Sequence, residues 1–366
     1  MRNRELSIYI HFLFCKSRCP YCDFFKGILP KNFNEDEYVK EVISELDDLS
    51  KLSGNRDVKS IFFGGGTPSI LSDKAVYLIL NEIGKKYNIK NGAEISIEAN
   101  PNTYDREKFV GFNKAGINRL SLGVQSLSQD DLRFLGRTHS KDDAIKAIEA
   151  GVEIFDKFSI DLIYGRSDKD DLDMWFKEID EALRFGVKHI SLYQLMIEEG
   201  TIFHKKNVKA QEDEKSACFY EKTVEYLRQN GFERYEVSNF AKDEFNRSVH
   251  NLVYWQGGDY IGLGKGAHGR LKVDNKIYAL VDGKIDCNLS AYERAEELVI
   301  MGLRIKEGIK KKDFYEASGL ALFDVVDYNK IMELKNMGLM DVNDDGVWLT
   351  DRGMLLMNKI IEEILL

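Results

Sequence analysis

The sequence lacks three features that would each point to a class of protein. It has no surplus of basic residues, since 52 Lys and Arg stand against 61 Asp and Glu and give a net charge of −9. This balance argues against nucleic-acid binding, which needs clustered positive charge. No run of about 18 apolar residues predicts a transmembrane helix. The chain begins Met1-Arg-Asn-Arg-Glu without the apolar stretch of a signal peptide, so we expect a cytoplasmic protein. No basic amphipathic helix indicates a membrane surface, although peripheral membrane contact stays open.

Cysteine is also scarce, and its distribution is uneven. Five cysteines, an odd number, do not indicate the disulfide framework of a secreted protein. Cys15, Cys19 and Cys22 fall within eight positions, whereas Cys218 and Cys287 stand alone. Three thiolates on one loop can bind three irons of a [4Fe-4S] cluster and leave the fourth iron for a small molecule. Two alternatives stay open: a zinc site with His11 as its fourth ligand, and buried cysteines that bind no metal.

Short apolar runs alternate with helical patterns through the first 200 residues. Such alternation predicts parallel βαβ units, and near-continuous apolar strands are typical of a sheet covered on both faces. The helices begin after Ser or Asp and several end before Gly, as in Gly116-Ile-Asn. The expected strands are Leu6–Phe12, Ser60–Gly64, Glu94–Ala99, Arg119–Gln125, Phe158–Tyr164 and His189–Leu195.

After about residue 200 this alternation ends. An irregular, aromatic- and Gly-rich stretch over 235–269 precedes a polar hairpin-like segment around 272–284. A small helical module then ends in a short hairpin, a pattern that resembles a winged helix. We therefore expect a barrel domain over residues 1–235, a connecting region over 236–288 and a mainly helical C-terminal domain over 289–366.

Polar residues recur where the predicted strands end. The cysteines follow the first strand, and Gly64-Gly-Gly-Thr-Pro-Ser follows the second. In parallel α/β barrels the carboxyl ends of the strands carry the active site, so we expect these residues to share one rim. The remaining members of this set are Glu98-Ala-Asn-Pro, Gln125-Ser, Asp161 and Gln194.

The C-x3-C-x2-C spacing, with Tyr21 before the last cysteine, resembles the motif of the radical S-adenosylmethionine (SAM) superfamily. This resemblance implies a partial (β/α)6 barrel, an α/β fold. It also implies that the open iron of a [4Fe-4S] cluster binds SAM, which is cleaved to methionine and a 5′-deoxyadenosyl radical. The Gly64-Gly-Gly segment resembles the part of the family that contacts the SAM amino group through its backbone, and glycine permits that close approach.

A longer set of motifs is similar to the oxygen-independent coproporphyrinogen oxidase group. It includes Tyr9-Ile-His11, the cysteines, Arg119-Leu-Ser-Leu-Gly-Val-Gln-Ser, Gly136-Arg-Thr-His and Asp161-Leu-Ile-Tyr-Gly. Carried over position by position, the resemblance implies that SAM is contacted by Tyr9, Gly65, Gly66, Thr67, Glu98, Gln125, Arg137 and Asp161.

Three features resemble the haem chaperone branch of this group, the HemW type, more than its oxidases. Phe24 stands where the oxidases carry a further cysteine, and only 14 residues precede Cys15. His250-Asn-Leu-Val-Tyr-Trp255 matches the H-N-x-x-Y-W motif of the chaperones. The resemblance implies a protein that binds haem and delivers it to client haemoproteins. We expect coproporphyrinogen oxidase activity to be absent. The alternatives are an oxygen-independent coproporphyrinogen III oxidase and a zinc-binding scaffold.

His250 is a candidate haem-iron ligand, and Tyr254 and Trp255 offer flat apolar surface for a porphyrin. A second interpretation is that His250 and Asn251 tie their segment to the barrel by hydrogen bonds. His268 and Cys218 are weaker candidates for the iron.

Overall fold

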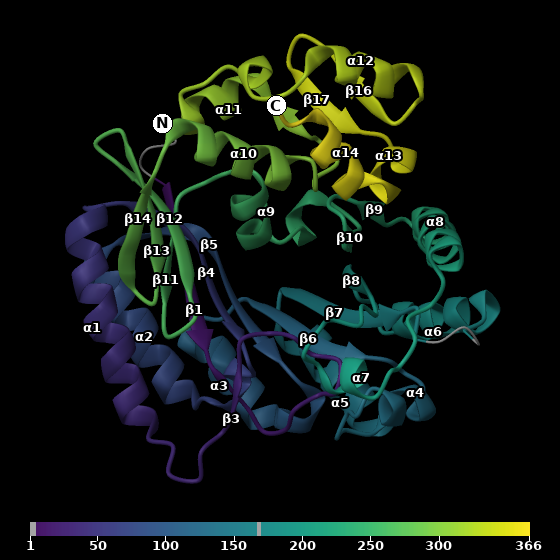
Figure 1. Ribbon diagram of the computed structural model, residues 1–366. Coiled ribbons are helices and arrows are strands. Elements are labelled where there is room, and N and C mark those ends of the chain that lie inside the picture. Colours follow the sequence, from purple (N-terminus) through teal and green to yellow (C-terminus); the bar gives the residue numbers. More distant parts are fainter. Residues whose placement is uncertain (1–4, 167–169) are drawn as a thin grey trace.

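The computed structural model describes residues 5–166 and 170–366, and a mixed sheet of 12 strands organises it (Figure 1). Six parallel strands form its centre in the order β1-β4-β5-β6-β7-β8, which is the predicted partial (β/α)6 barrel. All six expected strands are present, with ends shifted by up to six residues. Their bounds are Glu5–Phe12 (β1), Asp57–Gly65 (β4), Asn88–Ala99 (β5), Arg119–Gln125 (β6), Lys157–Tyr164 (β7) and His189–Gln194 (β8).

Helices cover the outer face of these strands, and their apolar sides form one continuous core with the sheet. Polar caps set where they begin: the Ser72 side chain accepts from Ala75 N, and Ser140 forms a capping box with Asp143. Gly116 ends α3 in the left-handed conformation. These helices are α1 (Glu35–Ser53), α2 (Asp73–Lys86), α3 (Arg106–Ala115), α5 (Lys141–Ile154), α6 (Leu172–Arg184) and α8 (Asp213–Gln229). Two short helices, α4 (Gln129–Phe134) and α7 (Ile202–Lys205), lie outside this core.

The stretch that looked irregular in the sequence extends both edges of the barrel sheet. On one edge β11 (Tyr260–Leu263) pairs in parallel with β1 and leads into an antiparallel meander. On the other edge β10 (Asn239–Ala241) pairs with β8. The short helix α9 (Val249–Trp255) connects these two edges. The predicted hairpin is thus three strands rather than two. The remaining strands are β9 (Glu233–Arg234), β12 (His268–Val273), β13 (Lys276–Val281) and β14 (Lys284–Leu289).

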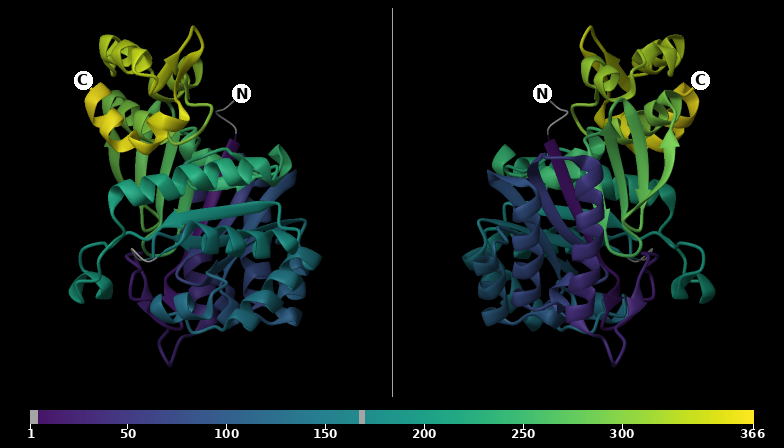
Figure 2. Two further views of the ribbon diagram at one scale, coloured as in Figure 1. Left: turned by 90° about the vertical axis from the view of Figure 1, so that its right-hand side faces the viewer. Right: turned by 90° about the vertical axis from the view of Figure 1, so that its left-hand side faces the viewer.

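The C-terminal module has a hydrophobic core of its own and ends in the predicted hairpin, which a further short strand extends to a three-stranded sheet. Figure 2 shows it at one end of the barrel, with the segment between β1 and α1 at the opposite end. The module therefore lies away from the carboxyl ends of the parallel strands. Its elements are α10 (Ala291–Gly302), β15 (Ile309–Lys310), α11 (Lys311–Ser318), α12 (Tyr328–Asn336), β16 (Met340–Val342), β17 (Gly346–Leu349), α13 (Asp351–Leu355) and α14 (Met357–Ile364).

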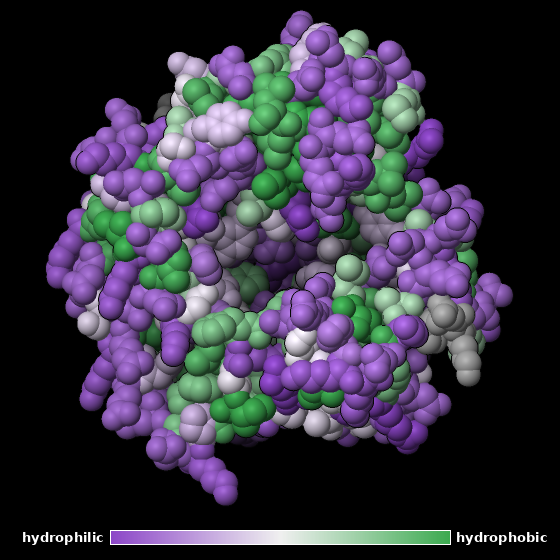
Figure 3. All heavy atoms as spheres, in the orientation of Figure 1, coloured by the Kyte–Doolittle hydropathy of each residue, from purple (hydrophilic) through white to green (hydrophobic). Residues whose placement is uncertain are grey.

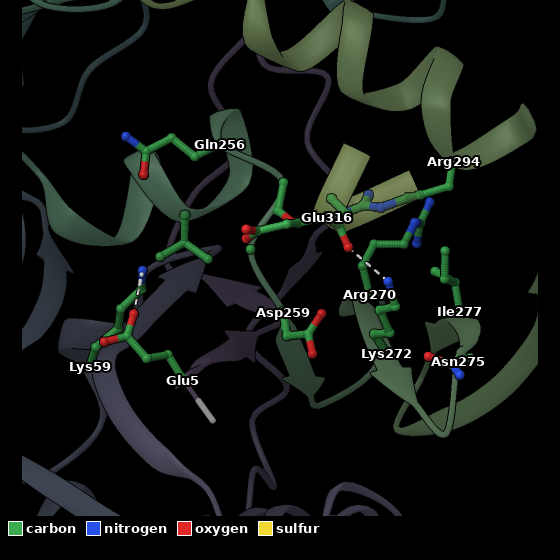
Figure 4. Close-up of a pocket in the computed structure, with 14 residues that line it drawn as sticks. Glu5, Lys59, Gln256, Asp259, Arg270, Lys272, Asn275, Ile277, Arg294 and Glu316 are labelled. Carbon is green, nitrogen blue, oxygen red and sulfur yellow. Dashed lines mark hydrogen bonds and ion pairs between the residues drawn. The ribbon is translucent and has the colours of Figure 1, made fainter. Parts of the chain in front are cut away.

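An ion-pair cluster joins the module to the meander beside a cavity of about 270 Å³ (Figure 4). Arg270 of β12 contacts Glu297 through Nε and Nη2, and Arg294 of α10 donates to the same carboxylate at 2.8 Å. Arg294 also donates to the Gly257 carbonyl after α9.

Among the helices of the described residues, none has the length and apolar run to cross a membrane.

Candidate functional site

Cys15 ends the short strand β2 (Phe14–Cys15), and Cys19 and Cys22 lie on the loop that leads from it to its paired strand β3 (Gly27–Ile28). The loop is fixed at its middle, because Phe203 N donates to the Pro20 carbonyl at 2.9 Å. A side chain at Gly136 would collide with the Pro20 ring, so the neighbouring chain approaches closely there as well. We call residues 15–28, which contain the three cysteines, the cluster loop.

One cavity of about 360 Å³ gathers nearly the whole predicted site. It lies at the carboxyl ends of the parallel strands, as expected of this fold. The face of the molecule in Figure 3 is hollowed at its centre, and hydrophilic residues lie deep in the hollow. The predicted residues that line the cavity are Cys15, Cys19, Cys22, Gly65, Gly66, Thr67, Glu98, Gln125, Arg137 and Asp161.

Two carboxyl groups, those of Glu98 and Asp161, line the cavity together, and the positive charges of Arg119 and Arg137 only partly offset the effect of burial on Asp161. Burial and the nearby Asp161 raise the pKa of Glu98 to about 8, and burial raises the pKa of Asp161 to about 6. Glu98 accepts from Gly65 N at 3.2 Å, and Asp161 accepts from Ser121 Oγ at 3.2 Å. Among residues 5–166 and 170–366 neither carboxylate forms an ion pair. A cationic group of a ligand would supply the missing positive charge.

A chain of hydrogen bonds links two of the cysteines through Asn100, which sequence reasoning did not select. Thr67 Oγ1 donates to Cys15 Sγ at 3.5 Å and accepts from Asn100 Nδ2 at 3.0 Å. Arg137 donates to the Asn100 side-chain oxygen through Nη2 and to Cys19 Sγ through Nη1, the latter at 3.3 Å. Burial raises the pKa of the Cys15 thiol, and the Thr67 hydrogen bond opposes that rise. Asn100 belongs to the Glu98-Ala-Asn-Pro motif, and its place in that motif could have identified it as a site residue.

The donor set fits an iron–sulfur cluster with SAM. Three cysteines line one cavity, hydrogen-bond donors reach two of their sulfurs, and the uncompensated carboxylates can hold a cationic amine. Gln125 has φ of 69°, in the left-handed region, where a glutamine is strained. Such outliers concentrate at functional sites, and this one ends β6 beside the cavity.

The close packing of the neighbouring chain requires glycine at the end of β4 and directly after it. A Cβ on Gly66 would lie 2.6 Å from the Phe14 carbonyl oxygen, and one on Gly65 would lie 2.7 Å from the His11 ring. Unlike the other predicted SAM contacts, Tyr9 does not line the cavity of the cysteines. It lines a second, interior cavity of about 350 Å³ that also touches Glu98 and Asp161.

His11 does not line the cavity of the cysteines. Its Nδ1 contacts Tyr9 Oη at 3.0 Å, and its Nε2 contacts the Phe25 carbonyl at 3.1 Å. In the part of the chain that the structure describes, no three His, Cys, Asp or Glu side chains are grouped to hold a single metal ion. The zinc alternative therefore lacks its fourth ligand in this geometry.

His250 is fully buried on α9 and lines the interior cavity. Its Nδ1 contacts Ser60 Oγ at 2.9 Å and its Nε2 contacts Tyr254 Oη at 2.7 Å. Burial lowers the pKa of His250 to about 3, so the ring is neutral. These contacts are those of the second interpretation, in which His250 ties its segment to the barrel.

The backbone before and within α9 is held by a buried ion cluster. His250 N donates to Glu94 Oε1 at 3.2 Å, and Lys157 contacts the other oxygen at 3.1 Å. Arg119, which lies 3.5 Å from Glu94, donates to the Asn246 carbonyl at 3.0 Å. His268 and Cys218, the two weaker candidates for a ligand of the haem iron, are exposed and do not line the interior cavity with His250.

Two family models match the chain: the Radical SAM superfamily over residues 9–179 and the HemN C-terminal domain over residues 289–356. The Escherichia coli protein named heme chaperone HemW is 32% identical over 98% of this chain and 97% of its own length. The Haemophilus influenzae protein of that name is 33% identical over 98% of this chain and 97% of its own length. The Bos taurus "Radical S-adenosyl methionine domain-containing protein 1, mitochondrial" is 32% identical over 99% of this chain and 88% of its length.

Among solved structures, coproporphyrinogen III oxidase (HemN) from Escherichia coli superposes with a TM-score of 0.80. It is 21% identical and covers 99% of this chain and 90% of its own. At that identity the likeness establishes the fold: a radical SAM α/β barrel followed by a HemN-type C-terminal domain.

Proposed function

Because this chain belongs to the HemW haem chaperone family of the radical SAM superfamily, we propose that it binds haem and delivers it to haemoproteins. The observation that carries the proposal is that the likeness to proteins of that name runs over nearly the whole length of both chains. The H-N-x-x-Y-W motif lies within that length, on α9. The identity of the client proteins is a matter for experiment.

We propose that Cys15, Cys19 and Cys22 are the three protein ligands of a [4Fe-4S] cluster. Arg137 and Thr67 direct their donors at two of the sulfurs, and such hydrogen bonds orient thiolate ligands and tune the potential of a cluster. Bound together, the cluster and SAM supply the one-electron chemistry of the superfamily.

We propose that the cavity also holds SAM. Glu98 and Asp161 hold its cationic amine, because both carboxyl groups line the cavity and neither forms an ion pair among the described residues. Arg137 offers a guanidinium for the SAM carboxylate, and Gln125 adds an amide. The remaining proposed contacts are Gly65, Gly66, Thr67 and Tyr9, the last from the side of the interior cavity.

His250 stays the proposed haem ligand of the H-N-x-x-Y-W motif, with a structural condition. Its Nε2 must first leave the Tyr254 hydroxyl before it can reach iron. Replacing His250 by Ala should alter the haem spectrum or affinity if the ring binds iron. Haem binding unchanged by this substitution would remove the ligand but not the chaperone function.

The function is tested by supplying haem and coproporphyrinogen III in parallel to anaerobically reconstituted protein with SAM and reductant. We expect a stable haem spectrum and no decarboxylated product. Phe24 at the position of the oxidase cysteine supports this expectation. Turnover of coproporphyrinogen would overthrow the proposal in favour of an oxidase, and a colourless protein that binds zinc would favour a scaffold.

A further inference from the structure

Two exposed apolar side chains, Phe24 and Met196, line the cysteine cavity, and a third, Phe25, follows Phe24 on the cluster loop. Phe24 is 66% exposed and Phe25 is 57% exposed on the cluster loop, and Met196, after β8, is 56% exposed. Phe24 follows β1 and Met196 follows β8, so the first and the last of the six parallel strands each contribute one side chain to the cavity. We name Phe24, Phe25 and Met196 the rim patch. Apolar side chains left in water beside a cavity commonly mark a binding surface.

Phe25 is held in place although it is exposed. Its ring lies against Gly266, where a Cβ would come within 2.3 Å of it, and its carbonyl contacts His11 Nε2. The His11 and Phe25 rings are 6.3 Å apart between centroids. A fixed aromatic ring can receive a flat ligand without the cost of ordering a mobile side chain.

The rim patch lies among positive charges in a chain whose net charge is −9. Lys16 and Lys26 line the same cavity, and Lys26 Nζ lies 6.0 Å from the Phe24 ring centroid. Arg18 is on the same loop. Within the described residues, none of these three cations forms an ion pair. The acids that line this cavity are Asp23 and Glu198, together with Glu98 and Asp161 at the ends of β5 and β7.

We propose that haem docks on the rim patch, with its macrocycle against Phe24, Phe25 and Met196 and its propionates toward Lys16 and Lys26. This proposal rests on the haem chaperone function and assigns it a surface. Haem combines a flat apolar ring with two carboxylates at one edge, and the rim offers aromatic surface beside two ammonium groups. Lys16 Nζ donates to the Asn102 carbonyl at 3.4 Å, and neither lysine forms an ion pair among the described residues. Because Phe24 and Met196 line one cavity and His250 lines another, the rim patch is a docking surface from which haem would have to move to reach His250.

The other cavities suit haem less well. The cation that lines the interior cavity, Arg119, already lies 3.5 Å from Glu94 and donates to the Asn246 carbonyl, so it is not free for a propionate. At the cavity of Figure 4, Arg270 and Arg294 are already paired with Glu297, and Lys59 lies 3.3 Å from Glu5. A carboxylate entering there would have to displace an existing partner.

Haem titration of cluster-loaded protein, followed by absorbance, tests the surface. The double variant Phe24→Ser/Phe25→Ser should bind haem at least tenfold more weakly, and Lys26→Glu about fivefold more weakly with a reduced dependence on salt. Because Phe24 and Phe25 adjoin Cys22, iron and sulfide are assayed in each variant. Met196→Ser, which lies off the cluster loop, should weaken haem binding in the same direction.

Tyr315→Ser and Lys312→Glu on α11 are the matched controls, since Tyr315 is 60% exposed and Lys312 is exposed. They should bind haem as the unaltered protein does. Affinity within twofold of that protein in Met196→Ser and Lys26→Glu would overturn the rim site, most clearly if His250→Ala abolishes binding. Failure of the unaltered protein to bind haem at all would instead refute the proposed function.

Discussion

The five cysteines form two groups that should respond differently to substitution. Cys19 lies in the cavity and accepts a hydrogen bond from Arg137, whereas Cys287 is exposed on β14. Replacing Cys19 by Ser should therefore remove most of the iron and sulfide, while replacing Cys287 by Ser should leave both unchanged. Iron and acid-labile sulfide after anaerobic reconstitution measure this. Loss of iron from the Cys287 or Cys218 variant would contradict the ligand assignment.

Glu98 should make the protein less stable as the pH rises. Its pKa is about 8 in the folded protein and 4.5 for an ordinary glutamate, so the folded state binds the proton more tightly than the unfolded state. The stabilising proton is lost as the pH rises toward 8, and each unit of pKa difference corresponds to about 1.4 kcal/mol in the free energy of unfolding.

Cluster-loaded protein without SAM, unfolded by denaturant at pH 6 and at pH 8, reveals this effect. Glu98→Gln should lose less stability between the two pH values than the unaltered protein. Glu149→Gln, at an exposed position on α5, is the control and should keep the original pH dependence. Equal pH dependence in all three proteins would show that Glu98 titrates in its ordinary range.

The end of β6 combines backbone strain with a polar side chain. Gln125 in the left-handed region should cost about 1 kcal/mol relative to glycine. Gln125→Gly should therefore unfold at higher denaturant concentration than Gln125→Ala, although both should bind SAM more weakly than the unaltered protein. SAM titration and denaturant unfolding separate the two effects. Unchanged SAM affinity in both variants would exclude the amide as a contact.

The parallel strands were predictable because both of their faces are covered, which leaves apolar runs in the sequence. The expected and observed bounds of β6 agree at Arg119–Gln125. By contrast, β11 has four residues and pairs with β1 some 250 positions away along the chain. A run that short carries no periodicity, and nothing local determines which edge it joins.

The same division applies to the site. The cysteine spacing and the residues at the strand ends carried enough chemistry to be selected individually. Asn100 was missed because its importance comes from contacts with Thr67 and Arg137, which the fold brings together from separate strands and loops. The exposure of Phe24 and Phe25 also depends on which parts of the molecule leave the cluster loop uncovered, which a linear pattern does not specify.

In the molecule as a whole, the ion pairs of Glu297 should couple the unfolding of the C-terminal module to the unfolding of the barrel. Glu297→Ala leaves Arg270 and Arg294 without their shared acceptor, at a cost of roughly 1–2 kcal/mol. Calorimetry should show a lower transition temperature and a broader or divided transition. Glu333→Ala, which removes a more exposed partner of Lys330, should leave the transition unchanged. A single unaltered transition in Glu297→Ala would mean that apolar contacts alone join the module.

The buried ion cluster of Glu94, Lys157 and Arg119 should limit how fast His250 can reach the iron of a bound haem. Moving α9 and the residues before it out of the interior would remove one hydrogen bond from Glu94 and one from Arg119, although these two charges and Lys157 stay together in the core. Each hydrogen bond to a charged group that is lost costs about 1.5–3 kcal/mol. An open form of that kind would occupy on the order of one molecule in a thousand. Any capture of iron by His250 must then wait for opening, so its observed rate should level off as haem concentration increases. Stopped-flow mixing should reveal a fast concentration-dependent phase from surface contact, followed by this slow, saturating one.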